Sequence, residues 1–376
     1  MTTTAEISNE VAEAAKAKLP NGWRWVKLGE IVRRQSSNSQ LIKGRLSFSP
    51  ASNLFPAYSA SGQDVWHIEA EHKGKAIILS AVGARCGKCF LADGEWSAIA
   101  NTHIIWPIAE QVDVDFLWYL LNDENFWAKD QAIQPFVQVG ATLQKEIALP
   151  PLAEQKRIAG ILKEQMAAVD RARASAEAQL QAAEHLPAAY LRAIFTNGES
   201  KSWERKTLGE LCKIVQGEAL GLPELTSSGF PVYGANGRIG YYTRYHYEKP
   251  QVLVSCRGAK CAAINFSEPK SYVTNNSMAM LPRDASQLDI EYLRWVLDGG
   301  VAKAAISGSA QPQITRESLS PIEIIVPPLA DQKRIAAQLS SQMAAAERLR
   351  QMLTDQLDAI DKLPVALLRR AFNGEI

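Results

Sequence analysis

Apolar residues recur at spacings of three and four in two stretches, one after Pro151 and one after Pro328. Both stretches are rich in Ala, Leu, Glu, Gln, Lys and Arg, which are strong helix formers. A narrow apolar seam with this spacing is typical of helices that form coiled coils. We expect the seam of the first helix at Ile158, Leu162, Met166, Val169 and Leu180, and that of the second at Ile335, Leu339, Met343, Leu349, Leu353, Leu357 and Ile360.

The two long helices are expected at residues 151–199 and 328–376. Proline stands just before each helix start, where its missing N–H costs nothing. Pro187 and Pro364 should interrupt the helices near their ends and kink them. The simplest arrangement pairs the two seams, because neither helix has another obvious partner. Such a pair would be a stiff spacer about 50 Å long at a rise of ~1.5 Å per residue.

The segments before the helices, residues 20–150 and 200–327, have a different pattern of short apolar runs separated by Gly and Pro. Runs such as Ala76–Ser80 and Val252–Ser255 predict strands, and Val114–Asn122 and Ile290–Leu297 predict helices. We therefore expect two α+β domains, mostly antiparallel. Residues 1–19 are polar and Ala-rich and are expected to form a helical extension.

The whole pattern occurs twice. Pro150–Ala159 (PPLAEQKRIA) returns 177 positions later as Pro327–Ala336 (PPLADQKRIA). Gly83–Cys86 likewise corresponds to Gly258–Cys261. A duplication of this length predicts two pseudo-symmetric structural units that bind or hold two similar things.

Composition limits the class of protein. The chain has 376 residues with 47% apolar and 22% charged residues, as in ordinary soluble proteins. No apolar run is long enough for a membrane helix, the N-terminus does not resemble a secretory signal, and five cysteines suit a reducing compartment. We therefore expect a cytoplasmic protein without a membrane partner.

Charge is balanced overall at +1 but unevenly distributed. Basic stripes that recur in both copies favour an anionic partner such as DNA, although a single charge run can equally be a solvated face. Flexible polar stretches at matching places could be contact loops or simple turns. The candidate DNA-binding residues are Arg33, Arg34, Lys43, Arg45, Arg85, Lys88, Gln138, Arg238, Arg244, Arg257, Lys260, Gln311 and Gln313.

Signatures of catalysis are missing from the sequence. It has no Walker-type loop, no nucleophile elbow and no zinc-protease helix. Cys86 and Cys89 have a metal-like spacing, but one such pair is weak evidence for zinc, and buried reduced thiols are the better expectation. We expect no catalytic residues, no metal and no cofactor on this chain.

The doubled PPLx(E/D)QKRI motif, the sequence GSAQP at 308–312 and the ending LLRRAFNG together resemble the specificity subunit of type I restriction–modification systems. The resemblance implies two target-recognition domains, at 20–150 and 200–327, each reading one half of a bipartite site on double-stranded DNA. It implies that the helices form an antiparallel coiled coil that sets the spacing of the two halves. It also implies docking of two methyltransferase subunits and of restriction–translocase subunits, with S-adenosylmethionine, ATP and Mg only on those partners.

Two alternatives stay open from the residues. The chain could be the recognition subunit of a type II enzyme whose single partner both cleaves and methylates. It could also be a coiled-coil scaffold that never contacts DNA, although the basic stripes speak against this.

Overall fold

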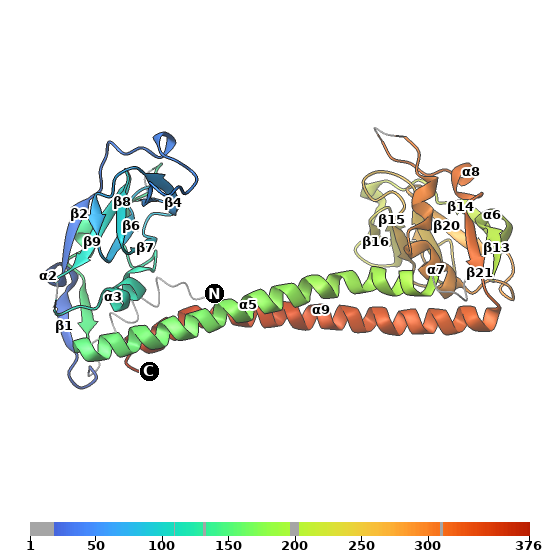
Figure 1. Ribbon diagram of the computed structural model, residues 1–376. Coiled ribbons are helices and arrows are strands. Elements are labelled where there is room, and N and C mark those ends of the chain that lie inside the picture. The colour runs from blue at the N-terminus through green and yellow to red at the C-terminus, as the bar shows by residue number, and fades with distance from the viewer. Residues whose placement is uncertain (1–18, 109, 131–132, 196–202, 309–310) are drawn as a thin grey trace. The chain divides into compact units, whose positions relative to one another are not determined.

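A computed structural model describes residues 19–108, 110–130, 133–195, 203–308 and 311–376 (Figure 1). Residues 1–18 of the expected N-terminal helical extension lie outside this part of the chain. The chain divides into two compact units: unit 1 comprises residues 1–174 and 358–376, and unit 2 comprises residues 175–357. Unit 1 is therefore built from two separate stretches of sequence.

Unit 1 contains three main sheets. The first pairs β1 (Arg24–Lys27) with β12 (Glu146–Leu149). The second has the order β2 (Val32–Ser36), β9 (Thr102–Pro107), β6 (Ala76–Ser80), β7 (Cys89–Ala92). The third has the order β4 (Gly62–His67), β3 (Phe55–Ser59), β8 (Glu95–Ala98), β5 (His72–Lys73). The smaller elements are the pair β10 (Lys129–Asp130) and β11 (Phe136–Val137), helices α2 (Leu28–Ile31), α3 (Val114–Leu121) and α4 (Val139–Thr142), and a 3-10 turn at Lys43–Arg45.

Unit 2 repeats this framework. Strand β13 (Glu204–Thr207) pairs with β21 (Glu323–Val326). The larger sheet has the order β14 (Cys212–Gln216), β20 (Ser277–Pro282), β17 (Val252–Ser255), β18 (Ile264–Phe266). The other has the order β16 (Gly237–Tyr242), β15 (Phe230–Gly234), β19 (Tyr272–Val273). Helices α6 (Leu208–Leu211), α7 (Ile290–Asp298) and α8 (Arg316–Leu319) and 3-10 turns at Leu222–Glu224 and Val301–Ala305 complete it.

The two frameworks share irregular details as well as strand order. Strands β3 and β8 pair in parallel, as do β15 and β19, whereas the other pairs of named strands in the described residues are antiparallel. A register shift lies at Ala57/Tyr58 in unit 1 and at Val232/Tyr233 in unit 2. The predicted pseudo-symmetric α+β architecture is confirmed.

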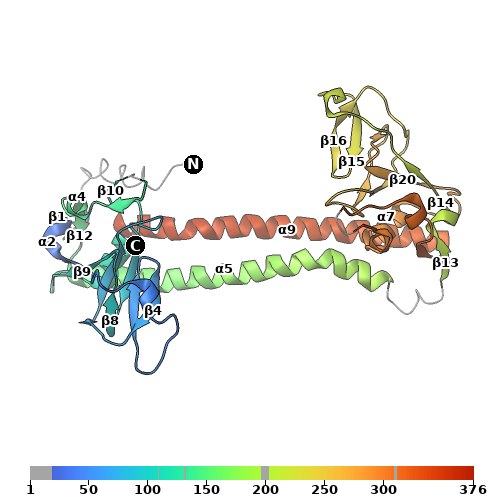
Figure 2. The same ribbon diagram turned by 90° about the horizontal axis from the view of Figure 1, so that it is seen from above.

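Both long helices are present. Helix α5 spans Leu152–Phe195 and α9 spans Leu329–Phe372, each of 44 residues (Figure 2). They continue through Pro187 and Pro364, so the predicted interruption is wrong. A proline removes a single backbone donor, and the helical hydrogen bonds on either side of it suffice to carry each helix onward.

The helices run antiparallel within each unit. In unit 1 the start of α5, with Ile158 and Leu162, shares a core with Ala371 near the end of α9. In unit 2 the end of α5, with Leu191 and Ile194, shares a core with residues near the start of α9. The predicted antiparallel coiled coil is confirmed, and each unit takes part of its core from the helix that follows the other unit's sheets.

Charged pairs repeat with the same symmetry. In unit 1 the Arg173 guanidinium pairs with the Asp361 carboxylate. In unit 2 the pKa of Arg350, which lies 177 positions after Arg173, is raised by its hydrogen bond to Glu347 and more weakly by the charge of Glu184. Glu184 in turn lies 177 positions before Asp361. Equivalent positions on α5 and α9 thus carry opposite charges that interact in both units.

Most of the predicted seam is buried, with one correction. Ile158, Leu162, Val169, Ile335, Leu339, Leu353 and Ile360 are buried, and Met166, Leu180, Met343 and Leu357 are half-buried. Leu349 is instead 40% exposed. Buried positions alternate by four and three only if the seam runs from Ala346 through the half-buried Arg350 to Leu353, and this rotates Leu349 onto the flank.

A buried glutamine explains the repeated motif. The side chain of Gln332 is fully buried, and its Oε1 accepts a hydrogen bond from the backbone N–H of Asp289 at 2.8 Å. Its Nε2 donates to the carbonyls of Gln287 and Pro327, both at 2.8 Å. Gln155 makes the equivalent three bonds to Asp113, Gln111 and Pro150. Because Asp113 and Asp289 cap α3 and α7, each glutamine joins the start of a long helix to its α+β framework.

Candidate nucleic-acid interface

In unit 2 a segment of loop lies against the end of β17. The residues just after β17 bridge to the segment before α8, with Arg257 paired to Gln313. The backbone N–H of Ile314 donates to the carbonyl of Cys256 at 3.0 Å, and that of Gly258 donates to Pro312 at 3.3 Å. Three sequence candidates, Arg257, Gln311 and Gln313, are thereby brought together, and all three are exposed.

A cleft of about 480 Å³ lies between this segment and the outer strand β14. We call residues 257 and 313–317 its loop wall and residues 213–216 its strand wall. The floor contains the buried Ile214, Met278 and Ile314. The polar lining residues are Lys213, Gln216, Arg257, Gln313, Thr315, Arg316 and Glu317. Three cations, two amides, a hydroxyl and a carboxylate thus face one hollow.

Glu317 is the acceptor of this set. Hydrogen bonds from its own backbone amide and from the Thr315 hydroxyl hold the pKa of Glu317 below its usual range. It is therefore ionised at neutral pH and can accept hydrogen bonds beside Arg316, whose guanidinium lies 4.0 Å from it. Amide, guanidinium and carboxylate groups are the side chains that hydrogen-bond base edges in the major groove.

The equivalent place in unit 1 has the same backbone geometry. Val82 bridges to Phe136, as Arg257 bridges to Gln313. The N–H of Val137 donates to Ala81 at 2.9 Å, and that of Gly83 donates to Pro135 at 2.8 Å. Three candidates lie on or beside these segments: the exposed Arg85 and Gln138 and the half-buried Lys88.

The outer strand β2 of unit 1 presents Arg33 and Arg34, both exposed. The Arg33 guanidinium lies 5.7 Å from the centre of the Trp106 ring, which is within cation–π range. Arg33 is equivalent to Lys213, because each is the second residue of the strand that follows the repeated Leu-Gly-Glu turn. Both units therefore place a cation on the strand wall.

The five remaining candidates are distributed over both frameworks. Lys43 and Arg45 lie in the 3-10 turn after β2, and Lys43 pairs with Asp64. Arg238 lies on β16, where it pairs with Glu268 at 3.1 Å, and Arg244 follows that strand. Lys260 is exposed in the loop that begins at Arg257. The structure does not bring Lys43, Arg45, Arg238 or Arg244 to the β2 or β14 edge.

Sequence reasoning missed Lys213, Gln216, Arg316 and Glu317. The candidates were chosen from basic runs and from matching repeat positions, and no dense basic run surrounds these four residues. The available signal was their position beside sequences that occur in both units. Lys213 occupies the place of Arg33 after the Leu-Gly-Glu turn, and Arg316 follows directly after the segment that matches Gln134–Gln138.

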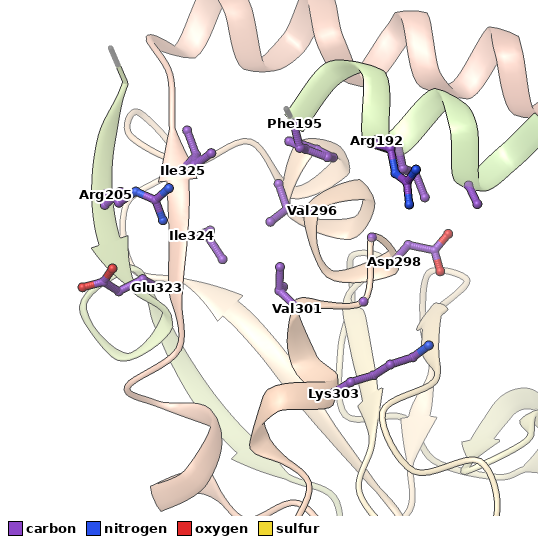
Figure 3. Close-up of a pocket in the computed structure, with 14 residues that line it drawn as sticks. Arg192, Phe195, Arg205, Val296, Asp298, Val301, Lys303, Glu323, Ile324 and Ile325 are labelled. Carbon is purple, nitrogen blue, oxygen red and sulfur yellow. The ribbon is translucent and has the colours of Figure 1, made fainter. Parts of the chain in front are cut away.

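A second hollow in unit 2 has a volume of about 540 Å³ and lies among α5, α7, β13 and β21 (Figure 3). Arg192, Arg205 and Lys303 line it together with Asp298 and Glu323. Burial raises the pKa of Asp298. Two carboxylates accompany the three cations of this hollow, whereas one accompanies the three cations of the β14 cleft, so this hollow matches an anionic backbone less well.

The cysteines are free thiols, and four of the five are buried. The Cys89 thiol donates to the carbonyl of Leu121 at 3.3 Å, and burial raises its pKa strongly. A thiol that resists deprotonation is a poor metal ligand. No group of three or more His, Cys, Asp or Glu side chains in the described residues is placed to hold a metal ion, and no described helix is long and apolar enough to cross a membrane.

Comparison with known proteins gives a consistent result. The family model described as "Type I restriction modification DNA specificity domain" matches twice, at residues 20–177 and 200–357. The EcoDI specificity subunit of a type I restriction enzyme from Escherichia coli is 24% identical over 96% of this chain and 90% of its own length. The putative MjaX specificity subunit from Methanocaldococcus jannaschii is 23% identical over 82% of this chain and 77% of its own length.

Two solved structures share the fold. The crystal structure of the HsdS subunit from Thermoanaerobacter tengcongensis aligns over 96% of this chain and 98% of its own, with a TM-score of 0.64 and 22% identity. A chain solved in work on complex assembly and conformational transition of the type I R-M system aligns over 96% of this chain and 100% of its own, with a TM-score of 0.70 and 22% identity. Because the family model covers both repeats, this chain belongs to the type I restriction–modification DNA specificity family and carries two of its domains in tandem.

Proposed function

We propose that this chain is the non-catalytic, sequence-specific DNA-binding subunit of a type I restriction–modification complex. Each unit reads one half of a bipartite site on double-stranded DNA. The observation that carries the proposal is the repeated edge, in which a cationic outer strand lies beside an exposed loop segment in both units. The double family match supports this function over a DNA-independent scaffold.

The chemistry of the edge suits DNA. Arg33 and Lys213 on the strands, and Arg85 and Lys260 on the loops, are cations at equivalent positions that can neutralise phosphates. Phosphate contacts position a protein on the duplex and carry no sequence information, whereas contacts with base edges specify. The cations are shared by both units, as expected of groups that contact phosphates. The exposed loop residues differ between the units, as expected of groups that contact bases.

The helices supply spacing and docking in this proposal. A pair of antiparallel helices is stiff, and the separation of two half-sites on a duplex is a geometric quantity that the protein imposes. Two methyltransferase subunits dock on the helix pair, and restriction–translocase subunits join for cleavage. S-adenosylmethionine, ATP and Mg are held by those partners. The chain itself acts in the cytoplasm.

The first experiment maps adenine methylation in the host by single-molecule sequencing. We expect one bipartite motif that disappears on deletion of this gene and returns with the wild-type gene. A motif that survives deletion would refute the proposal.

The second experiment measures the affinity of the assembled methyltransferase complex for its duplex as a function of salt. The variant Arg257→Ala/Lys260→Ala should bind more weakly, and its log–log salt slope should be shallower by about 0.9 for each phosphate that it no longer neutralises. Lys249→Ala, at an exposed position on the loop before β17, is the control for loss of charge. Equal affinity and equal salt slope in wild type and double variant would show that the β14 cleft is not part of the DNA interface. A complex without any sequence preference would support the alternative of a DNA-independent coiled-coil scaffold.

A further inference from the structure

The loop walls of the two units occupy equivalent places but display different chemistry. In unit 2 the bridge consists of Arg257 and Gln313, both exposed, and in unit 1 it consists of the half-buried Val82 and Phe136, which is 40% exposed. The same change continues along the chain, where Gly140 of unit 1 occupies the place of Glu317. At the bridge itself, two hydrogen-bonding side chains in unit 2 are thus replaced by two apolar side chains in unit 1, although the exposed Gln138 still lies two residues after Phe136.

The framework does not require this difference. The backbone hydrogen bonds that hold the loop segment are the same in both units, so a polar or an apolar side chain is equally compatible with the fold at these positions. Phe136 is 40% exposed, so part of its side chain is free to contact a partner. By contrast, the equivalent positions Arg33/Lys213 and Arg85/Lys260 are positively charged in both units. This is expected for groups that contact phosphates, which are the same at every base pair.

Further polar groups of unit 1 lie on β2 and β9. Arg34 and His103 take the places of the buried Ile214 and Met278 of unit 2. Burial, with the nearby charge of Arg34, lowers the pKa of His103. The half-buried His103 ring is therefore neutral at neutral pH. On the loop wall itself the exposed apolar side chain is that of Phe136.

We propose that the loop wall of each unit contacts bases, and that the two units discriminate by different chemistry. Unit 2 forms hydrogen bonds to base edges in the major groove through Arg257, Gln313 and Glu317. Unit 1 makes an apolar contact with the C5-methyl group of thymine through Phe136 and Val82. The inference rests on the proposed function, because it assigns specificity within the same interface. Apolar side chains distinguish thymine by its methyl group, and Arg, Gln and Glu distinguish guanine, adenine and cytosine by hydrogen bonds.

The test first assigns each half-site to a unit. Methylation motifs are sequenced in hosts that carry Phe136→Ala or Gln313→Ala, and the half that becomes degenerate is the half read by the mutated unit. Both side chains are exposed, so neither change should unfold the protein. We expect the two variants to relax opposite halves.

The affinity of the assembled complex is then measured for duplexes in which deoxyuridine replaces thymine in one half or the other. Loss of the methyl group in the Phe136 half should weaken binding about fourfold, the equivalent of one methyl burial. The same change in the other half should alter affinity less than about twofold. The variant Phe136→Gln, which carries the residue of unit 2, should lose the sensitivity to deoxyuridine.

Two outcomes would overturn the inference. These are a complex that is insensitive to deoxyuridine in the Phe136 half, or a Phe136→Gln variant that remains as sensitive as wild type. In each of these cases a complex that still prefers its site leaves the proposed function intact. A complex with no site preference at all would instead contradict the proposed function itself.

Discussion

Leu349 and Leu353 provide a matched test of the helix pair, because they are the same residue type one turn apart on α9. Leu353 is 5% exposed and lies in the seam, whereas Leu349 is 40% exposed and lies on its flank. Truncating a buried leucine to alanine removes its transfer free energy and leaves a cavity, at a cost of about 2–5 kcal/mol. Leu349 buries less surface and leaves no enclosed cavity, so its truncation should cost about 1 kcal/mol or less.

The assay is equilibrium unfolding of the full chain in urea, followed by helical circular dichroism. We expect Leu353→Ala to shift the midpoint several times further to low urea than Leu349→Ala. Leu353→Asp would bury an unpaired carboxylate and should prevent the helices from pairing, whereas Leu349→Asp should be tolerated. Leu353→Met is the control for a change of shape without loss of volume. If the Leu349 variants are as damaging as those of Leu353, the seam does not pass through Arg350 and its assignment is wrong.

Three further predictions concern single groups. Gln332→Met leaves the buried partners of its amide without hydrogen bonds and should cost about 3 kcal/mol or more, whereas Gln338→Met at an exposed position of the same helix should be neutral in the same urea titration. Because burial lowers the pKa of His103 in the folded state, the unfolded chain takes up the proton first as pH falls below about 6.5; stability should therefore decline below that pH, and less steeply in His103→Gln. Alkylation followed by mass spectrometry should modify the half-buried Cys261 well before the buried Cys89, whose thiol resists deprotonation, and equal rates would contradict the buried environment of Cys89.

The sequence predicted the repeated parts of this protein better than its individual contacts. Heptad spacing and the doubled motif were enough for two paired helices and two similar α+β units, since both signals are periodic. The position of Leu349 was wrong because a step of three residues after Ala346 fits an apolar pattern as well as a step of four, and only the facing helix distinguishes them. The domain boundaries proposed from the sequence, 20–150 and 200–327, stay a prediction.

Long-range contacts were beyond the sequence. Gln155 and Gln332 form hydrogen bonds to loops more than forty residues away. The sequence therefore indicated the repeated motif but not the contacts that its glutamine makes. The β14 cleft joins a strand to a segment about a hundred residues later, and its charges are too dispersed to form a basic run. Repeat equivalence would have located Lys213 had it been applied to isolated charges as well as to basic runs.

The division of each helix between the units has a consequence for biosynthesis. Residues 358–376, which include Ala371 in the core of unit 1, leave the ribosome only after all of unit 2 has been made. Unit 2 is therefore the first to have all of its core segments. Until the end of α9 has been made, apolar surface on the unit 1 part of α5 stays uncovered. A chain that ends between residues 357 and 371 would therefore have all of unit 2, whereas its unit 1 would lack part of its core and be a target for chaperones and proteases.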